Sequence, residues 1–346
     1  MQGLNDRHIG VRTTVTLAIA TLGAVLAWLG SAPVFILLGP AVAVSLSGLA
    51  GLRVEIAPGL RDVCFVVLGV AVGSGFDRDA LGAMIRWPLA VLFVVVLIWM
   101  MLLICRRVLV RQFGFDHRAA LLAGSPGHLS FVVAYAQESG ADVARVSIVQ
   151  SVRLLCLSIV VPFVALWMGV DVNGAIAPQG EIMPLLTLLV VFATALLVAR
   201  VIAHLRVPAA LLLGAMLTSG VGHLTGWAPG VPPDWLVLPA YLVFGALIGT
   251  RFSGMTLKAL AGGLAAGLTT TGIAAVLTVS GAIPVAWALG MPLAHVLVAF
   301  APGGLETMIV MGVIIGVVPG FVAACHISRL LVLSVLLPAM LGRSKP

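Results

Sequence analysis

Long apolar runs separated by short polar connections dominate the sequence. Hydrophobic residues make up 61% of the 346-residue chain and charged residues only 9%. A soluble domain cannot cover that much apolar surface, so lipid must cover part of it. The sequence therefore predicts a polytopic, all-helical membrane protein whose first partner is the lipid bilayer. Its apolar runs lie near 11–30, 32–50, 61–76, 84–105, 118–137, 143–170, 183–200, 207–223, 236–250, 258–280, 292–315 and 318–342.

The basic residues predict how these runs cross the membrane. The net charge of +7 is scattered between apolar segments, which is typical of positive-inside topology and does not indicate a nucleic-acid partner. If 118–137 and 292–315 are re-entrant, each half crosses five times and nearly every basic loop is cytoplasmic. If all twelve runs crossed, Arg200, Arg206, Arg251 and Lys258 would face outward. We therefore expect about ten spans in a bacterial inner (cytoplasmic) membrane, with both termini cytoplasmic.

An internal repeat organises the chain. The stretch AGSPGHLS at 123–130 aligns with AFAPGGLE at 299–306, and this alignment sets a fixed offset between the two halves. The same offset pairs Arg153 with Arg329 and Gly69 with Gly245. Since a period this long indicates duplication of a whole subdomain, we expect a first repeat over 1–170, an external linker over 171–182 and a second repeat over 183–346. Five crossings per half would give the two copies opposite orientations, as in many secondary transporters.

The two Pro-Gly pairs at equivalent positions are the first candidate site. Proline and glycine interrupt a helix, and non-helical backbone at membrane depth is tolerated only where it is buried in protein or lines an aqueous cavity. A half-helix that begins after such a break offers free N–H groups to an anion. A kink that only aids packing is the alternative. The candidate residues at the two breaks are Ser125, Pro126, Gly127, His128 and Ser130, and Pro302, Gly303, Gly304 and Glu306.

Two arginines complete the candidate substrate-binding site. Arg153 and Arg329 each lie about ten residues into the last span of their half, so at about 1.5 Å per residue they are near the bilayer middle. Gln150 and His326 are one helical turn earlier on the same helix face. These side chains could bind a carboxylate or a similar anion. The alternative is a structural ion pair between one arginine and Glu306, which could instead be a coupling carboxylate.

Metal and nucleotide chemistry are not indicated. The four cysteines lie within apolar segments without CxxC spacing, and the histidines show no HxxH or HExxH spacing. There is also no Walker A sequence. The sequence therefore predicts no enzyme, no catalytic residue, no bound metal and no cofactor, with H⁺ or Na⁺ as the candidate coupling ion.

The stretches SPGHLSFVVAYAQESGADVARVSIVQSVRLL and APGGLETMIVMGVIIGVVPGFVAACHISRLL resemble the bacterial AbrB-family membrane proteins, which are distinct from the soluble AbrB DNA-binding regulator. These duplicated proteins carry SPGG-like segments followed by a helix with an arginine. The first copy departs from that pattern at His128 and Ser130, and the second at 317–319. The resemblance implies a fold similar to the cation/proton antiporter and anion transporter superfamily: two inverted repeats, each with about five transmembrane helices and one re-entrant or broken helix.

Three functions follow as hypotheses. The first is a secondary transporter of a small anionic or zwitterionic solute, working by alternating access at the repeat interface. The second is a membrane-embedded oxidase, after the ammonia monooxygenase label that some family members carry, and the third is a non-transporting membrane regulator or scaffold. The sequence leaves open the solute, the coupling ion and whether the chain forms a homodimer, as the scaffold half of such folds often does.

Overall fold

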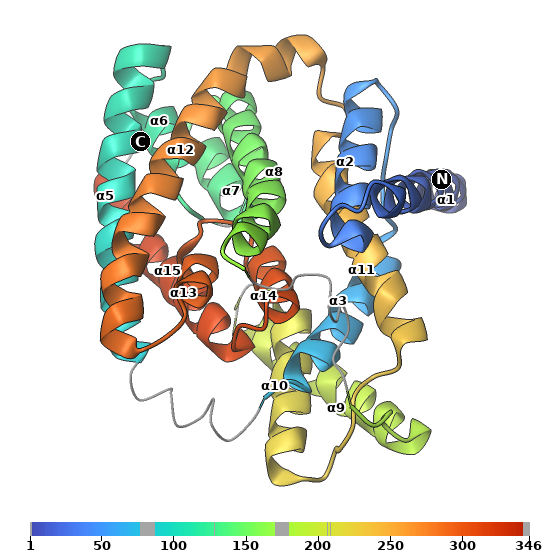
Figure 1. Ribbon diagram of the computed structural model, residues 1–346. Coiled ribbons are helices and arrows are strands. Elements are labelled where there is room, and N and C mark those ends of the chain that lie inside the picture. The colour runs from blue at the N-terminus through green and yellow to red at the C-terminus, as the bar shows by residue number, and fades with distance from the viewer. Residues whose placement is uncertain are drawn as a thin grey trace. The chain divides into compact units, whose positions relative to one another are not determined.

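The long elements of the described chain are all α-helices, in agreement with the expected class. The computed structural model describes residues 2–76, 87–127, 129–169, 180–205, 207 and 209–341, and the side chains of residues 2–7 and 130 are outside this description. Within these residues there are fourteen α-helices and no β-strand (Figure 1). They are α1 Gln2–Leu29, α2 Phe35–Leu49, α3 Pro58–Gly73, α5 Trp87–Phe113, α6 His117–Gly124, α7 Leu129–Ser139, α8 Val143–Trp167, α9 Leu185–His204, α10 Ala210–Thr225, α11 Asp234–Gly249, α12 Leu257–Leu289, α13 Leu293–Phe300, α14 Leu305–Ile314 and α15 Pro319–Leu341.

Several of these helices are long and apolar enough to cross a membrane. Among the described residues, seven meet that requirement: α1, α5, α8, α9, α11 extended to Phe252, α12 and α15. Helices α2, α3 and α10 have 15 or 16 residues, which is shorter than the roughly 20 needed to cross the hydrocarbon core without thinning it. The chain is therefore a multi-pass membrane protein, and the count of ten crossings remains a prediction.

The helices divide into two compact units that both draw on the two halves of the sequence. Unit 1 comprises Met1–Leu81, Pro162–Thr256 and Val313–Pro319, and unit 2 comprises Gly82–Val161, Leu257–Gly312 and Gly320–Pro346. The two expected repeats, 1–170 and 183–346, do not coincide with these units, because each unit contains parts of both halves of the sequence. The proposed linker at 171–182 falls mostly outside the described residues, and the boundaries of the repeats remain a prediction.

Unit 1 is built on close contacts between helix backbones. Helix α3 packs along α10, and α2 packs along α11. A Cβ atom at Gly73 would overlap the carbonyl oxygen of Met216, and one at Gly249 would lie 2.9 Å from that of Ala41. Because Gly73 and Gly249 are related by the repeat offset, the repeated glycines have the same role: each permits a backbone approach that any side chain would block.

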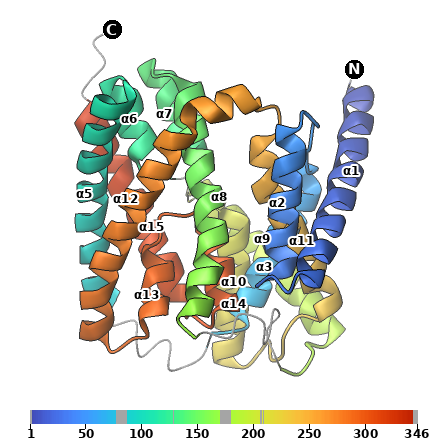
Figure 2. The same ribbon diagram turned by 45° about the horizontal axis from the view of Figure 1, so that its top comes forward.

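Unit 2 contains α5, α6, α7, α12 and α13, and most of α8, α14 and α15. Helix α12 packs against both α5 and α13, while α6 packs against α5. Figures 1 and 2 both show α12 crossing α8, and Gly263 and Gly267 permit this crossing because their positions face Ile148 and Val152 directly. Helix α8 carries the first candidate arginine, so this close crossing fixes the backbone from which it projects.

Helix boundaries repeat with the offset found in the sequence. That offset relates both ends of α6 to both ends of α13, the start of α7 to the start of α14, and the start of α8 to the start of α15. The repeat therefore extends to the positions at which helices start and stop. Both expected interruptions are observed, since residues 125–127 and 301–304 separate α6 from α7 and α13 from α14.

Candidate functional site: two helix breaks and two buried arginines

Each interruption begins with an extended residue followed by proline. Ser125 has φ −69° and ψ 133°, and Ala301 has φ −55° and ψ 128°. A proline excludes its predecessor from the helical region, so Pro126 and Pro302 determine where α6 and α13 end. The last carbonyl groups of each half-helix then lack the amide partners that a continuing helix would supply.

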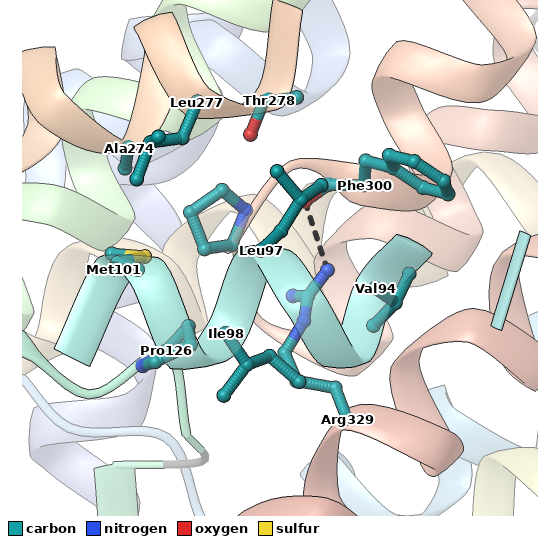
Figure 3. A pocket seen from close by; sticks show the side chains of 11 residues that line it. Val94, Leu97, Ile98, Met101, Pro126, Ala274, Leu277, Thr278, Phe300 and Arg329 are labelled. Atoms are coloured by element: carbon teal, nitrogen blue, oxygen red, sulfur yellow. Dashed lines mark hydrogen bonds between the residues drawn. The ribbon is translucent and has the colours of Figure 1, made fainter. Parts of the chain in front are cut away.

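Arg329 supplies those partners for α13. Its Nη1 donates to the carbonyl oxygen of Ala301 at 3.0 Å, and its Nη2 donates to those of Phe300 at 2.9 Å and Ala299 at 3.3 Å. Figure 3 shows the guanidinium reaching Phe300 from α15. A cation at this position also opposes the negative end of the helix dipole. Arg329 is 3% exposed and acts as the C-terminal cap of α13.

In the first half, the equivalent capping is done by Gln150. Its Nε2 donates to the carbonyl oxygens of Leu122 and Ser125, both at 2.9 Å, and of Ala123 at 3.4 Å. Two of these acceptors, Ala123 and Ser125, are the repeat partners of acceptors used by Arg329. The neutral amide of Gln150, one turn before Arg153, thus caps α6 as the guanidinium of Arg329 caps α13.

Arg153 is consequently left with unused hydrogen-bonding capacity. Its side chain is completely buried and donates through Nη2 to Oε1 of Gln150. Its Nε and Nη1 atoms have no partner among the described residues. Neither buried arginine takes part in the two ion pairs described for the chain, Arg12–Glu55 and Arg61–Asp62. A buried cation with unused N–H groups is costly and is suited to receive an anion.

His326 has a similar unused atom. Its Nδ1 lies 2.9 Å from the carbonyl oxygen of Val322, its buried Nε2 meets no described group with hydrogen-bond geometry, and the backbone carbonyl group of Ala301 lies near the ring. If the Nδ1–H donates to the Val322 carbonyl, Nε2 is left as a hydrogen-bond acceptor. His326 also lies close enough to Arg329 for the two groups to interact electrostatically. Arg153 and His326 therefore each carry a buried nitrogen without a described hydrogen-bond partner; His326 lines one of the cavities described next, and Arg153 is not among the residues that line them.

Both helix breaks line the same small cavity in unit 2. This cavity has about 10 Å³ of space open to a water molecule and is lined by Pro126, Gly127, Gly303, Leu305, His326, Arg329 and Leu330. A second cavity shares Pro126 and Arg329 with it, and its other lining residues are Val94, Leu97, Ile98, Met101, Ala274, Leu277, Thr278, Phe300 and Pro302 (Figure 3).

The two cavities are narrow. Only about 20 Å³ of the larger one is wide enough for a water molecule, where one water needs roughly 10–15 Å³ on the same measure. They therefore have room for water or a very small ion in this conformation, and a larger solute would require the helices to separate.

The structure brings most of the predicted site residues into one unit. Ser125, Pro126, Gly127, Gln150, Arg153, Pro302, Gly303, Gly304, Glu306, His326 and Arg329 all belong to unit 2. His128 lies outside the described residues, as does the side chain of Ser130. The hydrogen bonds of Arg329 described here go to backbone carbonyl groups, and an ion pair between one of the arginines and Glu306 stays an alternative.

Glu306 lies in the first turn of α14 and is 9% exposed. A carboxylate in the first turn is favoured by the positive end of the helix dipole.

The residues that α5 and α12 contribute to the larger cavity, such as Met101 and Thr278, were not predicted from the sequence, because neither lies near a motif.

These features define a multi-pass helical membrane protein with two interrupted helices and two buried arginines beside them. The family model described as "Transition state regulatory protein AbrB" matches residues 36–344, so the chain belongs to the AbrB family. Its apolar helices are those expected of the membrane AbrB family and not of the soluble regulator.

Two relatives have comparable similarity. The Bacillus subtilis (strain 168) protein YhjN is 26% identical over 294 residues, covering 79% of this chain and 75% of that protein. The Escherichia coli (strain K12) protein named "Putative regulator AbrB" is 27% identical over 227 residues, covering 64% of each chain.

Proposed function

We propose that the chain is a secondary transporter of a small anionic or zwitterionic solute in the bacterial inner membrane. The observation that supports this most directly is Arg153, which is completely buried yet has two N–H positions without a described partner. An ionisable group that is this costly at membrane depth is usually functional. Interrupted helices at repeated positions are also the arrangement that secondary transporters use for their solute sites.

The two arginines have different roles in this proposal. Arg329 and Gln150 are positioning residues, because their donors hold the ends of α13 and α6. Arg153 binds the anionic group of the solute, and Nε2 of His326 accepts a hydrogen bond from an N–H or O–H group on it. A solute with both features, such as a hydroxy acid or an amino acid, would use both residues.

Transport would proceed by alternating access. The narrow cavities around Arg329 represent a closed conformation in which a solute of this size cannot exchange with water. We propose that the two halves are inverted repeats, so that opening to one side and to the other uses equivalent movements. Glu306 is the candidate coupling carboxylate for H⁺ or Na⁺, and the protein is proposed not to be an enzyme.

The test is solute counterflow in proteoliposomes, after a thermal-shift screen of carboxylates, hydroxy acids and amino acids has found a stabilising solute. We expect Arg153→Met to abolish both the thermal shift and counterflow. Arg145→Met is the matched control, because Arg145 is on the same helix but has an exposed side chain that donates to the carbonyl oxygen of Gly114 and lies over the Phe115 ring. Normal counterflow in Arg153→Met would refute the assignment.

Coupling is tested separately. Glu306→Gln should retain solute binding and exchange but lose accumulation driven by a proton or sodium gradient. Accumulation equal to that of the original chain would remove Glu306 from the mechanism. Stoichiometric iron or copper in the purified protein would instead favour the membrane-embedded oxidase.

A further inference from the structure

A second cationic site lies at the end of α5, away from the helix breaks. A groove there is lined by Leu103, Arg106, Arg107, Val110, Arg111 and His117. Arg107, Arg111 and His117 are exposed, and Arg106 is partly buried. Three arginines so close together in the sequence give this short stretch a high positive charge density.

The arginines of this groove form no ion pair with the described part of the chain. Arg106, Arg107 and Arg111 take part in none of the ion pairs formed by the described chain. The nearby carboxylates have other roles: Asp116 accepts the backbone N–H groups of Arg118 and Ala119 at the start of α6, and Asp142 accepts that of Arg145. The three guanidinium groups therefore remain available to an external anion.

Another basic groove on the molecule provides a contrast. It is lined by Arg12, Arg53 and Arg61 in unit 1. There Arg12 pairs with Glu55 at 3.2 Å, and Arg61 pairs with Asp62 at 2.8 Å. Two of its three charges are thus already compensated, so the number of arginines alone does not make the α5 groove unusual. The difference is the absence of described acidic partners at α5.

An exposed apolar stripe leads to the α5 groove. Leu92, Val96, Trp99 and Leu103 are 59%, 47%, 53% and 40% exposed. Their spacing of four, three and four residues places them on one face of α5, which continues to Arg106 and Arg107. A ligand with an acyl chain beside the stripe would therefore present its polar end to the arginines.

We propose that this groove binds the phosphate group of an anionic phospholipid, with an acyl chain along the stripe. Guanidinium groups suit phosphate because their paired N–H donors match its oxygens. Basic pockets on membrane helices recognise anionic headgroups in the same way. The site does not depend on transport, and its ligand is a component of the surrounding membrane.

Lipid binding to the delipidated, full-length protein in detergent tests the proposal. Native mass spectrometry would compare phosphatidylglycerol with phosphatidylcholine. We expect phosphatidylglycerol to bind more tightly to the original chain, and the triple variant Arg106→Gln/Arg107→Gln/Arg111→Gln to lose about 100-fold in affinity, at about 5-fold for each arginine. The control Arg12→Gln/Arg53→Gln/Arg61→Gln has the same net charge change and should bind as the original chain does.

Further arms of the experiment distinguish the sources of phosphate. If glycerol 3-phosphate competes for the groove with an affinity equal to that of the lipid, the groove binds a soluble phosphate and the lipid proposal is wrong. Equal losses in the two triple variants, or no loss in the α5 variant, would also overturn it. If the triple variant does not fold, each single substitution should lower the affinity for phosphatidylglycerol roughly 5-fold. This loss should become smaller at high salt, because salt screens exposed charges.

Discussion

The unequal roles of the two arginines lead to opposite expectations for stability. Replacing each with methionine removes the charge while keeping an unbranched side chain of similar reach. Arg329 donates to three carbonyl groups, whereas Arg153 donates to Gln150 and has two nitrogen atoms without a partner among the residues that the structure describes. We expect Arg329→Met to destabilise the protein and Arg153→Met to leave it as stable or more stable.

The magnitude follows from the hydrogen bonds. A buried polar group left without a partner costs about 1–3 kcal/mol, so three abandoned carbonyls at the end of α13 give a loss of roughly 3–5 kcal/mol if the terminal turn relaxes. For Arg153, losing one charged hydrogen bond costs about 1.5–3 kcal/mol, and removing two unpartnered buried N–H groups recovers a similar amount. Removal of the buried charge itself favours the variant further.

Thermal unfolding of the purified variants in one detergent measures this difference. At about 2–4 °C per kcal/mol, the two variants should differ in Tm by roughly 10 °C, with Arg329→Met the lower. Arg145→Met is the control for loss of an arginine and should lower Tm by less than Arg329→Met does. Solute-dependent stabilisation, measured in the same experiment, should disappear in Arg153→Met.

A result in which Arg153→Met is as unstable as Arg329→Met would refute this reasoning. It would mean that Arg153 is needed to hold the fold, and that its buried charge has a structural partner in solution. A stable Arg153→Met that still responds to solute would instead refute only the binding role.

The remaining predictions concern local features of the fold. Gly73→Ala should destabilise unit 1 by more than about 1 kcal/mol, because the new Cβ would overlap the carbonyl oxygen of Met216. Gly262→Ala is the control, since a Cβ there meets nothing within 4 Å, and chemical unfolding of the two variants measures the difference. Asp116→Ala should cost about 0.5–2 kcal/mol through loss of the α6 N-cap, seen as faster amide exchange at Arg118 and Ala119. Arg12→Gln should change stability by less than about 1 kcal/mol, because its ion pair with Glu55 is partly exposed.

The sequence was sufficient to predict the helical class and the positions of both breaks. Proline and glycine act locally, so their repetition at one fixed offset identified the interruptions at 125–127 and 301–304. Helix boundaries repeat at the same offset because the residues that start and stop helices are also local signals.

That Gln150 caps α6 while Arg329 caps α13 could not be predicted in this way. Gln150 and Arg153 lie one turn apart on the same face, so either side chain could have reached the end of α6. The choice depends on side-chain length and on the distance between helices, which the sequence does not state. The units likewise could not be foreseen, because packing between distant helices such as α3 and α10 depends on which surfaces meet in three dimensions.

The capping of α6 by an amide has a consequence for how such a protein can change. Because Gln150 caps α6, the arginine at position 153 is not needed to cap that helix, whereas Arg329 is needed to cap α13. We therefore expect position 153 to accept new side chains without loss of the fold, and position 329 not to. If Arg153 binds the solute as proposed, variation in the preferred solute should accumulate at position 153 and its neighbours, and libraries that aim to redirect specificity should be randomised there.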